Sequence, residues 1–126
     1  MTGFVLFAHG SRVESANDAV RGVAGELSRS GGHAVAPAFL ELGKPDLAGA
    51  VDGLVAAGAS CIIVIPYFLT LGTHLQRDLP KLVRDSARKH PNLEMEVTAP
   101  LDGHPALLQV LLDRANEGLA KSTKPV

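Results

Sequence analysis

Short apolar runs and helix-length amphipathic segments alternate four times along this chain. Runs of apolar residues predict buried strands at residues 4–8, 34–40, 61–65 and 95–98. After each run, apolar residues recur at the spacing of a helix with one buried face. These stripes are Val20, Val23, Ala24 and Leu27; Leu47, Ala50, Val51 and Leu54; Leu79, Leu82, Val83 and the polar exception Ser86; and Leu108, Leu111, Leu112 and Ala115. The pattern therefore predicts four βα units.

Strands that alternate with helices are typical of a parallel sheet covered by helices on both faces. Right-handed crossovers leave few strand orders. We expect a flavodoxin-like α/β order in which the first and third strands are adjacent. In this interpretation residues 1–120 form one domain and residues 121–126 a short C-terminal tail.

Residues typical of helix ends set the expected boundaries. The first two helices are expected to end before Gly31-Gly32 and Gly58. The expected start signals are Ser15 with Asp18 as a capping box, Pro45 and Pro105 at first helical positions, and Asp78 as a cap with Pro80 in the first turn.

Each predicted strand is followed by a side chain that can bind metal or move protons, namely His9, Glu41, His74 and His104. Because the carboxyl ends of parallel strands share one edge of the sheet, all four are expected there. Adjacent strands lie about 4.8 Å apart. His9 and the loop that bears His74 would then flank the point between the first and third strands where open α/β sheets hold ligands, and a metal ion can bridge the two imidazoles.

Simpler interpretations stay open for these residues. His9 can be a strand-end histidine bonded to backbone, His74 an exposed loop residue, and Glu41 a solvated carboxylate. His104 precedes a proline at a helix start, where capping accounts for it about as well as a ligand role. The small residues after His9, and the run Tyr67-Phe68-Leu69 before His74, favour a ligand site.

Composition excludes several classes of function. The 126 residues are 46% hydrophobic and carry a net charge of −1, and they contain no basic block, so neither nucleic acid nor an anionic membrane is expected as a partner. The apolar run at the N-terminus is short and lacks a preceding charge, so we expect a cytoplasmic protein without a membrane span. The single cysteine, Cys61, is expected in the core.

Four motifs, one at each strand-to-helix junction, together resemble the short form of the sirohydrochlorin chelatase family. They are His9-Gly10-Ser11-Arg12; Phe39-Leu40-Glu41-Leu42 with Pro45; Pro66-Tyr67-Phe68-Leu69 with Gly72, His74 and Asp78-Leu79-Pro80; and Pro100-Leu101-Asp102-Gly103-His104-Pro105. The resemblance implies insertion of cobalt or ferrous iron into sirohydrochlorin, without ATP or a tightly held cofactor, on a route to cobalamin or siroheme. It also implies a homodimer.

The candidate residues suit that reaction. His9 and His74 are the expected metal ligands and proton acceptors, with Glu41 as a third catalytic group, because such donors release a metal more readily than a thiolate cage. The macrocycle must lose two N–H protons, and the ordinary pKa of an imidazole lies near neutrality. The expected substrate-binding residues, which include three cations for the eight carboxylates of sirohydrochlorin, are Ser11, Arg12, Lys44, Phe68, Arg77 and His104.

Other enzyme classes with this fold fit less well. A histidine phosphatase needs an arginine where Ala8 stands, and a response-regulator receiver needs acidic residues where His9 and Pro66 stand. A flavodoxin needs a phosphate loop rich in serine and threonine after the first strand, where this chain has Arg12-Val13-Glu14. The sequence also lacks the Gly-x-Ser-x-Gly motif of the α/β-hydrolases and the phosphate-binding loop of the nucleotide triphosphatases. A non-catalytic carrier of metal or tetrapyrrole on the same site is the alternative that the sequence leaves open.

Overall fold

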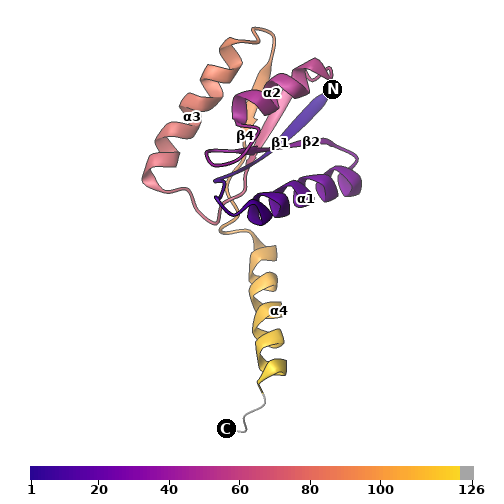
Figure 1. Cartoon of the computed structure of the whole chain (residues 1–126), viewed down its shortest axis with the longest axis vertical. Helices are drawn as coiled ribbons and strands as arrows, with labels where there is room; N and C mark the ends of the chain where they lie inside the picture. The colour runs from indigo at the N-terminus through magenta and orange to yellow at the C-terminus, as the bar shows by residue number, and fades with distance from the viewer. Residues whose placement is uncertain (123–126) are drawn as a thin grey trace.

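The computed structural model describes residues 1–122 and contains four strands and four helices in strict alternation (Figure 1). The elements are β1 (Thr2–Ala8), α1 (Glu14–Gly31), β2 (Ala34–Phe39), α2 (Leu47–Ala56), β3 (Cys61–Pro66), α3 (Thr73–Arg88), β4 (Glu94–Val97) and α4 (Pro105–Lys121). Each predicted strand and each predicted helix is present. Helix α4 runs to Lys121, and residues 123–126 of the expected tail lie outside the described part of the chain.

All four strands are parallel, in the order β2-β1-β3-β4. The expected adjacency of the first and third strands is therefore confirmed. In the register, Val5 lies between Ala36 of β2 and Val64 of β3. The point where the chain changes direction across the sheet lies between β1 and β3, so the carboxyl ends of these two strands form the switch point.

The main core lies between the sheet and helices α2 and α3. Val5 and Phe7 of β1 and Ile62 and Val64 of β3 are fully buried there, against Leu54 and other apolar residues of α2 and against Leu79 of α3. Apolar side chains on alternate strand positions reach this face, as the twofold strand periodicity requires. The stripes predicted for α2 and α3 therefore face the sheet.

Helix α1 covers the opposite face over β1 and β2. The guanidinium group of Arg21 in α1 lies 5.1 Å from the ring centroid of Phe39 in β2. Ala24, also in α1, is buried. Gly32 ends the helix in the left-handed conformation, with φ of 66°, as the sequence predicts. Gly58, which follows α2, also has a positive φ. The sheet thus has helices on both faces.

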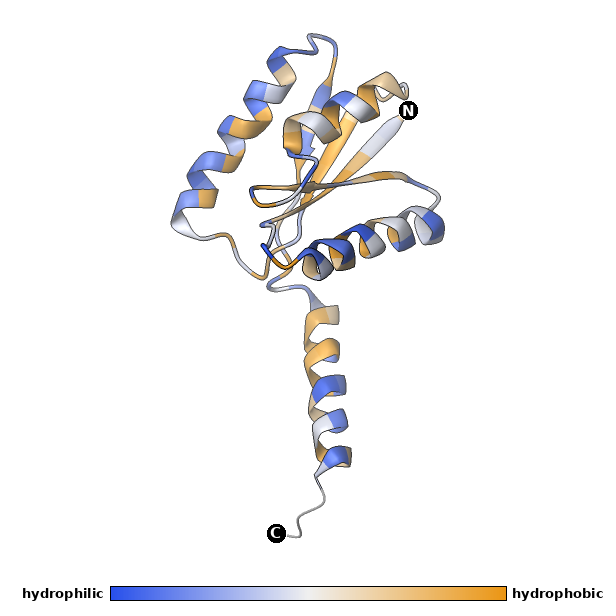
Figure 2. Cartoon of the chain, viewed as in Figure 1, coloured by the Kyte–Doolittle hydropathy of each residue, from blue (hydrophilic) through white to orange (hydrophobic). Residues whose placement is uncertain are grey.

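Helix α4 packs on neither face. It leaves the carboxyl edge of the sheet and projects from the body of the molecule (Figure 1), and none of its residues from Pro105 to Lys121 is buried. The sequence predicts a buried stripe on this helix, and the stripe is present but exposed (Figure 2). Within the described residues no helix is long and apolar enough to cross a membrane.

Three of the expected helix starts are wrong and one is correct. Helix α1 begins at Glu14, after Val13, without the predicted Ser15 capping box. Asp46, rather than Pro45, marks the start of α2, because its side chain accepts a hydrogen bond from the amide of Gly49 (2.8 Å). Helix α4 does begin at Pro105.

Helix α3 starts earlier than the sequence predicts. It begins at Thr73 and not at Asp78, and Pro80 lies inside it. A proline within a helix leaves the carbonyl four residues earlier without its donor, which here is that of Gln76. Pro80 and Gln76 are both exposed, so water can reach this region of the helix. His74 consequently lies in the first turn of a helix and not in a loop.

Candidate metal and substrate site

Backbone pairing continues beyond the ends of the strands and brings two predicted site residues together. The amide of Leu40 donates to the carbonyl of Ala8 (2.9 Å), and the amide of Glu41 donates to the carbonyl of His9 (3.0 Å). These two bonds extend the pairing of β1 and β2 past the last residue of each strand. His9 and Glu41 therefore lie side by side at the carboxyl edge of the sheet.

Glycine is required between these strand ends. Gly10 has φ of 94°, and a Cβ atom at this position would lie 1.7 Å from the carbonyl oxygen of Glu41. Such a contact is far shorter than a van der Waals contact, and the backbone conformation is one that L-residues rarely adopt. The His-Gly dipeptide thus lets the chain turn away from β1 while staying against the Glu41 loop.

The side chains of His9 and Glu41 face each other. Nε2 of His9 lies 3.3 Å from Oε1 of Glu41, and each side chain is a little over half exposed, at 57% and 56%. Nδ1 of His9 lies 2.9 Å from the carbonyl oxygen of Gly10. Because a carbonyl only accepts, Nδ1 carries the hydrogen, and Nε2 of the neutral ring presents a lone pair toward the carboxylate. Two such acceptors favour a cation between them, either a proton or a metal ion.

His74 shares a cavity with His9. The cavity has a volume of about 290 Å³ and is lined by His9, Leu40, Phe68, Gly72, Thr73, His74, Leu75 and Asp78. Its wall is mostly apolar, with two imidazoles and one carboxylate as its ionisable groups. The structure therefore places both predicted metal ligands, and the predicted substrate-binding residue Phe68, around one opening at the switch point.

The Nδ1 nitrogen of His74 is hydrogen-bonded to a neighbouring arginine. Nη2 of Arg77 lies 3.1 Å from Nδ1 of His74, and Nε of the same guanidinium group lies 3.3 Å from Oδ1 of Asp78. Since a guanidinium group only donates, Nδ1 of His74 is the acceptor and the hydrogen of the neutral ring lies on Nε2. His74 thus differs from His9 in which ring nitrogen carries the hydrogen. Among residues 1–122, no three histidine, cysteine or acidic side chains lie close enough to form a complete metal cluster.

A buried asparagine in α1 holds the two loops that carry His9 and Glu41. Asn17 is only 1% exposed, and its Oδ1 accepts from the amide of Ser11 (2.9 Å). Its Nδ2 lies within 3.1 Å of the carbonyl oxygens of Ser11 and Leu42 and of a carboxylate oxygen of Glu14. Hydrogen bonds from Arg21 and Asn17 lower the pKa of Glu14 below its ordinary value, so this carboxylate stays charged at neutral pH.

The predicted substrate-binding residues occupy different surroundings. Arg12 and Lys44 are exposed, on the loops after β1 and β2. The hydroxyl of Ser11 accepts from the amide of Val13 (3.0 Å). His104 does not line the cavity, and its Nδ1 accepts from the amide of Ala106 (3.0 Å), which is the capping arrangement. Its contact with a ligand stays a prediction.

Two residues of the site were not predicted. Asn17 lies inside a stretch of polar residues and breaks no pattern, so only its burial reveals its role. Asp78 was interpreted as a helix cap, and it lies instead one turn inside α3 on the cavity wall. The spacing of His74 and Asp78, four residues apart, would have placed both on one face of a helix if the start of α3 had been recognised.

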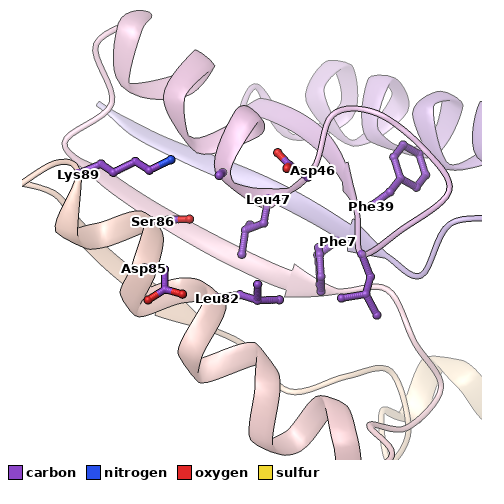
Figure 3. Close-up of a pocket in the computed structure, with 10 residues that line it drawn as sticks. Phe7, Phe39, Asp46, Leu47, Leu82, Asp85, Ser86 and Lys89 are labelled. Atoms are coloured by element: carbon purple, nitrogen blue, oxygen red, sulfur yellow. The ribbon is translucent and has the colours of Figure 1, made fainter.

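A second cavity, of about 180 Å³, lies between α2 and α3 and holds no histidine (Figure 3). Its polar groups include Asp46, Asp85 and Lys89. Asp46 caps α2, and Asp85 pairs with Arg88 at 3.2 Å. The chemistry expected from the sequence therefore lies in the cavity of His9 and His74.

The fold and this edge define a small parallel α/β protein with an imidazole and carboxylate site at its switch point. The chain belongs to the CbiX family, whose model matches residues 3–118. Among its relatives, a sirohydrochlorin cobaltochelatase of Saccharolobus islandicus is 34% identical over 128 residues, which cover 97% of this chain and 99% of that protein. The chloroplastic sirohydrochlorin ferrochelatase of Arabidopsis thaliana is 32% identical over 119 residues. These names confirm the family resemblance of the four motifs.

Solved structures show the same fold. The CbiX protein of Marinobacter aquaeolei VT8 superposes with a TM-score of 0.86 at 26% identity, over 97% of this chain and 100% of that one. The sirohydrochlorin chelatase SirB from Bacillus subtilis subspecies spizizenii, in complex with cobalt, superposes with a TM-score of 0.85 at 21% identity. This chain spans 50% of that SirB chain and 53% of the plant ferrochelatase, so those relatives are about twice as long.

Proposed function

We propose that this protein inserts a divalent metal, cobalt or ferrous iron, into sirohydrochlorin without ATP. The observation that carries the proposal is the pairing of Nε2 of His9 with Oε1 of Glu41, 3.3 Å apart, beside the cavity that His74 also lines. The metal is a substrate and not a resident cofactor. Family membership and the names of the relatives support the same reaction.

The nitrogen and oxygen donors of this site suit a metal ion that is bound only until it is transferred to the macrocycle. His9 offers the lone pair of Nε2 while its Nδ1 is fixed by the Gly10 carbonyl, an arrangement common for metal-binding histidines. Glu41 supplies an oxygen donor, and His74 supplies a second imidazole once Arg77 leaves it. Nitrogen and oxygen donors accommodate either cobalt or ferrous iron. As the metal passes from the imidazoles into the macrocycle, the ring loses its two pyrrole N–H protons, and the imidazole nitrogens that the metal leaves can accept them.

The macrocycle is proposed to lie over the same edge of the sheet. Its carboxylates would contact Arg12, Lys44 and Arg77, which are all exposed and follow the first three strands. The ring of Phe68 provides an apolar contact on the cavity wall. One protomer supplies only one wall, and a ligand site normally covers most of its ligand, so we propose a homodimer in which a second copy closes the cleft. A cytoplasmic location stays a prediction from the sequence.

Turnover with the free tetrapyrrole tests the proposal. Purified protein is mixed with sirohydrochlorin and either Co²⁺ or Fe²⁺ without oxygen, and the absorbance change on metallation is followed with and without protein. We expect the rate to rise in proportion to protein concentration, with many metallated molecules formed per protomer. Omitting ATP is expected to leave the rate unchanged.

The same assay separates an enzyme from a carrier. A carrier would bind sirohydrochlorin or metal in equimolar amount and leave the rate of metallation at the uncatalysed value. That result would overturn the proposed activity while leaving the binding site in place. A side-by-side comparison of the two metals would identify the better substrate.

A further inference from the structure

The carboxylate on the wall of the histidine cavity belongs to Asp78 and not to Glu41. Asp78 lines the cavity together with His9 and His74. Glu41 faces His9 from the loop after β2 and is not among the residues of that wall. The side chain of Asp78 is 52% exposed, so an ion in solution can reach its oxygens. An oxygen donor to which the proposed function gives no role therefore stands beside both imidazoles.

Helix α3 places Asp78 one turn after His74. Because α3 begins at Thr73, the two residues are separated by one regular helical turn. Residues four apart lie on the same face of a helix, with Cβ atoms about 5–6 Å apart. The two histidines of the His-Glu-x-x-His motif bind one zinc ion from a helix at this spacing. His74 and Asp78 are thus placed to bind one metal ion together.

A cation of the protein already contacts both of these donors. Nη2 of Arg77 lies 3.1 Å from Nδ1 of His74, and Nε of the same group lies 3.3 Å from Oδ1 of Asp78. Both contacted atoms act as acceptors, since a guanidinium group only donates. The side chain of Arg77 is 71% exposed and is free to turn into solvent. One positive group therefore occupies the two atoms that a metal ion would use.

We propose that Asp78 is a metal ligand, which binds the incoming ion together with His74 once Arg77 has moved away. The inference rests on the proposed function, because it adds an oxygen donor to the site from which the metal is transferred. The ion would then be held between two donor pairs. His9 and Glu41 supply one pair from the strand ends, and α3 supplies the other.

Charge balance favours a second carboxylate in this site. A divalent ion that is bound by two neutral imidazoles and Glu41 keeps one positive charge. The carboxylate of Asp78 brings the sum of the charges to zero. Since most of the cavity wall is apolar, an unbalanced charge there is costly. Two nitrogen and two oxygen donors also form a set that suits cobalt and ferrous iron.

An anchoring role for Asp78 would have the opposite consequence. If Asp78 only held Arg77 in place, it would keep the guanidinium group on His74, and its removal would open that imidazole to the metal. A ligand role predicts weaker metal binding without Asp78, whereas an anchoring role predicts tighter binding. The sign of the change in cobalt affinity therefore decides between the two roles.

Titration with Co²⁺ alone measures this affinity. Asp78→Asn keeps the size of the side chain and removes its charge. Loss of a group that merely supports a metal ligand lowers affinity by about tenfold to a hundredfold, so loss of a ligand is expected to lower it at least about tenfold. The loss should persist when Arg77→Ala is added. The matched control is Asp85→Asn, two turns further along α3, whose carboxylate pairs with Arg88 at 3.2 Å and should leave cobalt binding unchanged.

A thiolate at the same position shows directly whether residue 78 touches the metal. Binding of Co²⁺ to a thiolate gives an intense charge-transfer absorption in the near ultraviolet. We expect this band in Asp78→Cys and not in Asp85→Cys. The native Cys61 lies at the start of β3, at the opposite edge of the sheet, so the unaltered protein provides the baseline. Circular dichroism should show all these variants folded, because the substituted side chains are not part of the core.

Each outcome has one meaning for the ligand role. Unchanged affinity in Asp78→Asn would overturn it, whatever the spectrum of Asp78→Cys. Tighter binding would identify an anchor for Arg77 and overturn it as well. Weaker binding without the charge-transfer band would show an effect of charge alone, which also contradicts direct coordination. None of these measurements uses sirohydrochlorin, so a failure of the proposed chelatase activity would appear only in the turnover assay.

Discussion

Replacing His9 by alanine is expected to slow metallation of sirohydrochlorin at least about a hundredfold, because the imidazole acts as a metal ligand and accepts a proton. His74→Ala is expected to have an effect of similar size. Both side chains are exposed and line the same cavity. Neither contributes to the core, so the unfolding transition should stay where it is in the unaltered protein. The measurement is the initial rate with cobalt and with ferrous iron.

His33→Ala is the matched control for these two variants. His33 is exposed at the opposite edge of the sheet, next to the ring of Phe4, and should leave the rate unchanged. Glu41→Gln keeps the shape of the side chain but removes its charge, and it should lower the affinity for cobalt more than the affinity for sirohydrochlorin. Rates near those of the unaltered protein in both His9→Ala and His74→Ala would refute the assignment of the site.

Gly10→Ala is expected to destabilise the fold by about 3 kcal/mol or more, from backbone strain and lost hydrogen bonds. A Cβ atom here would lie 1.7 Å from the carbonyl oxygen of Glu41, so the loops after β1 and β2 must separate. That movement breaks the bond between the amide of Glu41 and the carbonyl of His9. The free energy of unfolding in urea measures the effect, and cobalt affinity should fall with it.

Gly32→Ala separates backbone strain from the clash. Gly32 also has a positive φ, of 66°, but a Cβ atom there would meet nothing within 4 Å. We expect a cost of about 1 kcal/mol from conformation alone. Cobalt affinity should not change, since Gly32 lies at the far end of α1. An equal loss of unfolding free energy in Gly10→Ala and Gly32→Ala would show that the close approach of Gly10 to Glu41 adds nothing to the effect of backbone conformation.

The periodicity of the sequence was sufficient to predict the sheet and its order, because each βα unit repeats the same pattern of a short apolar run and an amphipathic helix. It could not predict that α4 projects from the sheet with its apolar stripe exposed. The stripe of Leu108, Leu111 and Leu112 indicates only that one face is to be covered, and nothing local to the helix identifies the surface. Two backbone hydrogen bonds between residues 101–102 and residues 68–69, which are distant in sequence, attach the segment before α4 to the loop after β3, and the local pattern does not indicate them.

The candidate site was predicted better for His9 and Glu41 than for His74. Their closeness follows from adjacent parallel strands, which the sequence pattern indicates. The environment of His74 depends on the start of α3, and Pro80 led to the wrong start because prolines are more common in first turns. Asn17 could not be found from sequence, since its importance comes from burial against two loops that tertiary structure brings together.

The hydrogen bond between Arg77 and His74 makes the order of binding part of the site. While Nη2 of Arg77 occupies Nδ1 of His74, that lone pair is closed to a metal ion. A carboxylate of the tetrapyrrole attracts the same guanidinium group more strongly than a neutral imidazole does. In rapid-mixing experiments, protein first incubated with sirohydrochlorin should therefore react faster than protein first incubated with metal. By drawing Arg77 away, the bound macrocycle would free Nδ1 of His74 to bind the metal. The protein would thus gain its second imidazole ligand only when a macrocycle is present to receive the ion.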